Sequence, residues 1–159
     1  MQELEAIEIT TAEITADREQ TIFLAQPHPG TILLSHFEVS ELSPKDSSVE
    51  LTNLSIEQRH YLLAPVPLAL LQREQRYAQD RAEQQLKRRL KRLLGSVPLH
   101  LLQRFEPSRH EIRVIMLDVP WKSRQQLAVT FKNSGSAVVN KVVIKLILYA
   151  PDKPLPSVN

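Results

Sequence analysis

Residues 68–94 read LALLQREQRYAQDRAEQQLKRRLKRLL, and Gly95 follows them. The stretch contains no glycine or proline and consists largely of Leu, Ala, Gln, Glu, Arg and Lys, which favour the helical conformation. A glycine directly after such a run is typical of the residue that ends a helix in the left-handed conformation. The stretch therefore predicts one long helix in the middle of the chain.

The segments on both sides of this helix have strand patterns. Apolar and polar residues alternate before it, and β-branched runs follow it. We expect strands over residues 4–14, 21–25, 31–39, 111–119, 126–132 and 138–149. Strands followed by helices and again by strands predict an α+β fold, with a mostly antiparallel, sandwich-like or strongly curved sheet.

The boundaries predict one domain over residues 1–150, with acidic strands in 1–54, a helical insertion in 55–105 and C-terminal strands in 109–150. Residues 151–159 form a proline-rich tail. Ser55 and Gln58 stand at capping-box spacing, which predicts a short helix over 55–63. Two prolines then separate it from the long helix, and a third helix is expected over 99–105. The sequence Pro-His-Pro-Gly at 27–30 favours a hairpin between two strands.

The stretch from Leu127 to Tyr149, LAVTFKNSGSAVVNKVVIKLILY, resembles the strand–turn–strand core of FxLYD-type and related β-sandwich modules. Those modules have an Asn-x-Gly turn and a strand that ends in Leu-Tyr-Asp, whereas here Ala150 and Pro151 separate the tyrosine from Asp152. The resemblance implies a β-sandwich piece of a noncatalytic module, and it transfers no functional residues.

The long helix has two unlike faces at steps of about 100° per residue. One face is an apolar stripe that we expect to be buried, either in the core of the domain or against a second helix. The other face is almost entirely positive. The stripe consists of Leu71, Ala82, Leu86, Leu90 and Leu93, and the basic face consists of Arg81, Lys87, Arg88, Arg89, Lys91 and Arg92. Glu83 is the only acid between Arg81 and Arg92, so pairs within the helix cannot neutralise this face.

Charge is also distributed unevenly along the whole chain. Up to Glu57 there are 11 acids against 2 bases, a net charge of −9, and after it 7 acids against 18 bases, a net charge of +11. The leading hypothesis is a nonenzymatic protein–protein interaction or assembly module that self-associates through the basic helix and the acidic β segment. A nucleic acid backbone and an anionic membrane surface are the two alternative partners. A plain solvated helix face is the simplest interpretation of the charges.

The sequence gives little support to catalysis, metal binding or phosphate binding. No cysteine is present, the five histidines have no metal-ligand spacing, and no Gly-x-Ser-x-Gly or glycine-rich phosphate loop occurs. We therefore expect no catalytic residue, metal or cofactor. His28 and His36 could face each other across the predicted hairpin. Trp121 is expected at the edge of the core. No apolar run is long enough to span a bilayer, and a cytoplasmic setting is expected.

Overall fold

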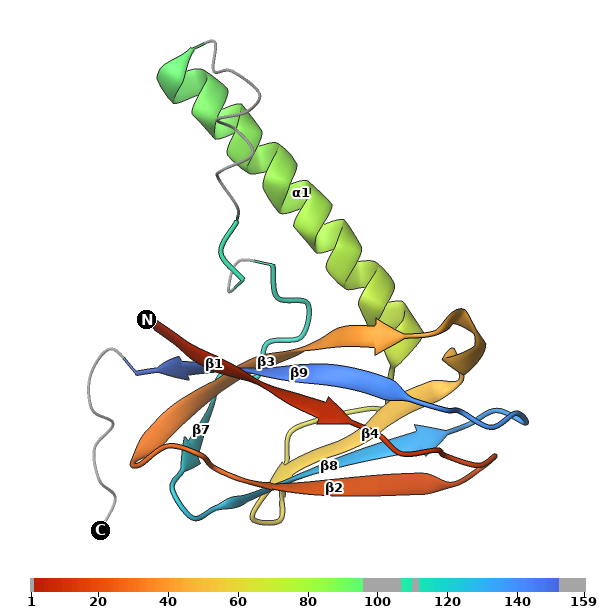
Figure 1. Ribbon diagram of the computed structural model, residues 1–159. Helices are drawn as coiled ribbons and strands as arrows, with labels where there is room; N and C mark the ends of the chain where they lie inside the picture. Colours follow the sequence, from red (N-terminus) through yellow and green to blue (C-terminus); the bar gives the residue numbers. More distant parts are fainter. Residues whose placement is uncertain (1, 96–106, 110–111, 152–159) are drawn as a thin grey trace. The chain divides into compact units, whose positions relative to one another are not determined.

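Two antiparallel sheets form a β-sandwich in the computed structural model, which describes residues 2–95, 107–109 and 112–151 (Figure 1). The four-stranded sheet has the order β1-β9-β3-β7, and the five-stranded sheet has the order β2-β8-β4-β5, with β6 also paired to β4. The strands are β1 (Gln2–Thr10), β2 (Glu19–Ala25), β3 (Thr31–Leu42), β4 (Val49–Ile56), β5 (Arg59–His60), β6 (Val66–Pro67), β7 (Val119–Lys122), β8 (Gln126–Asn133) and β9 (Val142–Ala150). The helices are η1 (Pro44–Asp46) and α1 (Leu68–Leu94). The predicted α+β sandwich with a central helix is confirmed.

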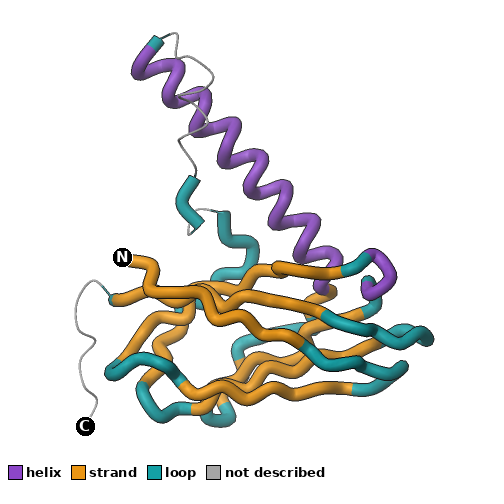
Figure 2. Tube along the Cα trace, viewed as in Figure 1, coloured by secondary structure: helices purple, strands orange, loops and turns teal. Residues whose placement is uncertain are grey.

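The connections between β1, β2, β3 and β4 each carry the chain from one sheet to the other, as do those between β7, β8 and β9 (Figure 2). The prediction of a hairpin at residues 27–30 is therefore wrong, because β2 pairs with β8 and β3 pairs with β9 and β7. Gly30 still supplies a turn conformation, with φ of +82°. His28 and His36 consequently do not face each other: His28 contacts Glu5, and His36 contacts Glu38.

The short helix predicted over residues 55–63 is also wrong. Strand β4 continues to Ile56 and turns back into β5, where Ile56 pairs with Arg59. The two residues of this turn, Glu57 and Gln58, both have positive φ values of 46° and 69°, as a type I′ hairpin requires. Burial of Leu54 (0% exposed) and Ile56 (4% exposed) on the sheet outweighs the local capping pattern of the sequence.

The strand predicted over residues 111–119 is shorter and lies later in the chain. Residues 112–118 are not in a strand, and β7 begins at Val119. Pro120 lies within β7, opposite Leu33, and does not end the strand as expected. A proline fits here because β7 is an edge strand that needs donors on one side only. The predicted helix at 99–105 and most of the tail lie outside the described residues.

The core between the sheets is mostly apolar, and the polar groups buried in it form hydrogen bonds. Trp121, expected at the edge of the core, is fully buried (0% exposed), and its Nε1–H donates to the Gln125 carbonyl oxygen at 3.0 Å. Asn133 is also fully buried. Its Nδ2 donates to the Ile14 and Ala137 carbonyl oxygens at 3.0 and 2.7 Å. A side-chain amide therefore satisfies the main chain where β8 ends and the chain turns toward β9.

The chain divides into two compact units by its internal contacts. One comprises Met1–Leu71 and Ile115–Asn159 and contains the sandwich, and the other comprises Gln72–Val114 and contains most of α1. The first turn of α1 belongs to the sandwich unit, where Leu68 and Leu71 are 0% and 2% exposed. These two leucines anchor the start of the helix in the sandwich.

Candidate interaction surface

Helix α1 has the predicted bounds, Leu68–Leu94, and its C-terminus is capped by the glycine that follows it. Gly95 adopts a φ of +67°, and its N–H donates to the Lys91 carbonyl oxygen at 3.0 Å. This single bond is the left-handed helix cap, which a residue with a β-carbon forms only with strain. The helix therefore depends on local propensity and on its cap, both of which are readable in the sequence.

The covered face of α1 follows the predicted stripe up to Leu90. Leu71 is 2% exposed and Leu90 is 9% exposed, and Ala82 and Leu86 are half-buried. Leu93 is 79% exposed, so the chain by itself does not bury it, and its burial against a second helix stays a prediction. The side chains of the stripe are therefore covered as far as Leu90 but not in the last turn of the helix. Leu93 nevertheless has nearly the same angular position on the helix as the covered stripe residues.

The middle of this stripe is weakly apolar. Between Leu71 and Leu86, the partly covered positions include Gln72, Gln75 and Ala78. Amide and methyl side chains bury little apolar surface, so burial contributes less to this part of the helix than to its first turn. The helix therefore remains a long surface element and not a core helix.

The six basic residues of the predicted face are all exposed: Arg81, Lys87, Arg88, Arg89, Lys91 and Arg92. None of them forms an ion pair with another residue that the structure describes. The nearby acid Glu83 is half-buried and accepts a hydrogen bond from Gln79 Nε2 at 3.2 Å. We name these six side chains the basic face.

The basic face is electrostatically unbalanced. Its residues lie within about 16 Å of helix, at a rise of roughly 1.5 Å per residue. Like charges at i, i+4 on a helix destabilise it by about 0.2–0.5 kcal/mol per pair, and Lys87–Lys91 and Arg88–Arg92 have this spacing. The helix C-terminus offsets part of this repulsion, since cations are favourable there. An anionic partner would relieve the rest.

The acidic residues of the first segment, which extends to Glu57, divide into two groups. Some stabilise the fold: Asp46 is 3% exposed and accepts from the Asn140 N–H at 3.3 Å, and Glu57 accepts from the Gln126 N–H at 2.9 Å. Others lie on the surface with no ion pair among the described residues, namely Glu8, Glu13, Asp17 and Glu19. These exposed acids are a second charged surface, of opposite sign.

One hydrogen-bonded series of side chains has the residue types of a catalytic triad, but its serine and histidine are buried. Ser35 Oγ lies 2.9 Å from His36 Nδ1, and His36 Nε2 lies 3.1 Å from Glu38 Oε1. Ser35 and His36 are 0% and 1% exposed, so no substrate reaches the hydroxyl. In the part of the chain that the structure describes, no group of three or more His, Asp or Glu side chains could hold a metal ion.

Comparisons of the chain with models of protein families, with curated proteins and with solved structures found no match. Among the described residues, no helix has the length and apolar character needed to cross a bilayer. The basic face is therefore identified as a candidate interaction surface by its geometry and charge alone.

Proposed function

We propose that the chain is a nonenzymatic assembly module whose basic face docks on an acidic protein surface. The observation that supports this is the basic face itself: six exposed cations on one helix, with no ion pair to the described part of the chain. Charges of one sign, held close together without counter-charges, favour association with the opposite sign.

We further propose that the acidic surface belongs to a second copy of the chain. Its first segment has a net charge of −9, and the exposed acids Glu13, Asp17 and Glu19 lie on or beside a folded sandwich and so need no ordering on binding. Docking of a helix of one copy on the sandwich of another joins two different surfaces. Such a contact is heterologous and builds rings or open chains.

The test is the solution mass of the wild type and of the variant Arg88→Glu/Arg92→Glu, measured by sedimentation at about 0.1 M and 1 M salt. The screening length falls from about 10 Å to about 3 Å between these salts. We expect self-association at the lower salt only, and none for the variant. The matched control Lys122→Glu/Arg124→Glu changes the same charge at exposed positions of the sandwich and should associate like the wild type.

A compensating change makes the test specific. Reversal of Glu13 and Glu19 to lysine should restore part of the association of the helix variant, as in a double-mutant cycle. A monomeric wild type at every salt and concentration would refute self-association.

Nucleic acid and anionic membranes are the competing partners, and the same variant separates them. Binding of phosphate backbones weakens steeply as salt rises, and we expect no submicromolar mobility shift near 0.15 M salt. A tight shift on generic duplex that Arg88→Glu/Arg92→Glu abolishes would assign the basic face to nucleic acid. Salt-sensitive sedimentation with vesicles rich in anionic lipid would assign it to membranes.

A further inference from the structure

Strand β1 has a free edge. It is the terminal strand of the order β1-β9-β3-β7, and in the described part of the chain it pairs with β9 alone. A bulge lies between Glu3 and Glu5, and the register is then unbroken from Glu5 to Thr10. Within the described residues, no other segment pairs with the outer side of this regular stretch. A regular edge of this kind is a template for another strand.

The pairing of β1 with β9 determines which N–H and C=O groups of β1 point toward the free edge. The Thr11 N–H donates to the Val142 carbonyl oxygen at 2.9 Å, in register with the β1–β9 pairs. Residues of an antiparallel pair alternate between those that bond the partner and those that face away. Ile7 and Ile9 therefore direct their main-chain groups toward β9. Ala6, Glu8 and Thr10 direct theirs to the free edge.

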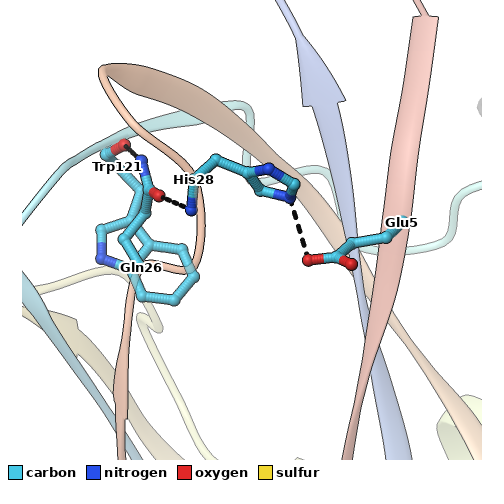
Figure 3. A network of polar contacts seen from close by, with 4 residues as sticks. All are labelled: Glu5, Gln26, His28 and Trp121. Atoms are coloured by element: carbon cyan, nitrogen blue, oxygen red, sulfur yellow. Dashed lines mark hydrogen bonds and ion pairs between the residues drawn. The ribbon is translucent and has the colours of Figure 1, made fainter.

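The start of this edge is held in place by a polar network (Figure 3). Glu5 Oε1 lies 2.9 Å from His28 Nε2. The loop that carries His28 is tied down by Gln26, whose Nε2 donates to the Gly30 and Trp121 carbonyl oxygens at 2.9 and 3.2 Å and whose Oε1 accepts from the His28 N–H. A fixed edge loses little conformational freedom when a strand is added.

The side chains of β1 determine which strand fits. Ile9 is 2% exposed and Ile7 is half-buried, whereas Ala6, Glu8 and Thr10 are exposed. β1 contains three glutamates and no lysine or arginine. Pairing with β1 of a second copy would bring glutamates together, and like charges across a strand pair are unfavourable. The charge of β1 therefore favours a different, basic segment.

We propose that the free edge of β1 binds an extended segment of a partner protein as an added strand. That segment carries lysine or arginine beside Glu8 and aliphatic side chains beside Ile7 and Ile9. The main-chain bonds supply affinity and the alternating side chains supply selectivity. This site goes beyond the proposed function, because it uses the main chain of the sandwich and not the basic face.

The test uses the full chain labelled with ¹⁵N and a peptide of about nine residues that alternates lysine with valine. At a free peptide concentration of 100 times Kd, hydrogen exchange of the Glu8 and Thr10 amides should slow about 100-fold, as binding linkage requires. Amides of β2, an edge strand of the five-stranded sheet, should not change. A peptide that alternates glutamate with valine should have no effect.

Two variants separate strand addition from simple charge attraction. Ala6→Pro removes one outward N–H without changing charge, and it should weaken peptide binding at least about tenfold, whereas Ala6→Val should not. Glu8→Lys should reverse the preference between the two peptides. The Arg88→Glu/Arg92→Glu variant should bind the lysine peptide like the wild type, which keeps this test independent of the basic face.

Three results would overturn the proposal. They are no binding of the lysine peptide by the wild type, equal binding by a folded Ala6→Pro variant, and an unchanged peptide preference in Glu8→Lys. The last holds even if Ala6→Pro fails to fold, because Glu8 is exposed and its replacement leaves the β9 bonds intact.

Discussion

Strand β9 and helix α1 are both rich in aliphatic residues, yet they relate to solvent in opposite ways. In β9 only Lys145 and Ala150 are not buried, because the strand lies between β1 and β3 in the sandwich. Among the α1 side chains that the structure describes, only Leu68, Leu71 and Leu90 are buried. The sandwich is stabilised by burial of apolar surface, and the helix depends more on its own hydrogen bonds and cap.

This difference also separates the roles of the two regions. A helix that is stable through local interactions can keep most of its surface exposed, so its charges are available to a partner. The sandwich unit includes only the first turn of the helix, whose two leucines are buried. The contrast predicts that equal chemical changes will have unequal effects in the two regions.

The largest effect is expected for aromatic truncation. Trp121→Ala removes a fully buried side chain and should lower the free energy of unfolding by about 3–5 kcal/mol, measured by urea denaturation. Tyr77→Ala on α1 truncates a 64% exposed ring and should change it by less than about 0.5 kcal/mol. Similar costs for both variants would mean that α1 buries its outer face, contrary to the comparison.

An intermediate effect is expected within the helix. Leu90→Asp places a charge at a buried position and should destabilise the Gln72–Val114 unit by about 1–3 kcal/mol, seen as faster hydrogen exchange of the α1 amides. Leu93→Asp, at a 79% exposed position, is the matched control and should leave exchange unchanged in the monomer. Slower or equal exchange in Leu90→Asp would show that the covered stripe does not stabilise the helix.

The smallest effect is expected at the β4–β5 turn, and it is a gain. Gln58 has φ of 69°, a conformation that costs a non-glycine residue about 1–2 kcal/mol. Gln58→Gly should therefore raise the free energy of unfolding by about 0.5–1 kcal/mol after the entropy of glycine is counted. Gln58→Ala should give no gain. A loss on Gln58→Gly would mean that the side chain contributes more than the strain it causes.

The sequence misleads at the elements where local and tertiary preferences disagree. Ser55 and Gln58 have the spacing of a helix start, but the strand residues beside them are buried on the sheet and the turn adopts positive φ. The two prolines and glycine after Gln26 mark a turn correctly, although the chain changes sheets there and does not form a hairpin. Among the candidate site residues, the basic face is exposed as its helical spacing predicts, and Leu93 shows that spacing alone does not specify what covers a stripe.

The sequence by itself determined α1 from Leu68 to Leu94 and its glycine cap, the approximate position of most strands and the opposite charges of the two segments. Helical bonds join residues four apart, and the cap needs one glycine, so both are local properties of the chain. Only the tertiary structure decided which strands pair, which edge of β1 is free and which acids remain on the surface. Those features depend on contacts between residues far apart in the sequence, such as Ile9 with Ile144, and no local pattern encodes them.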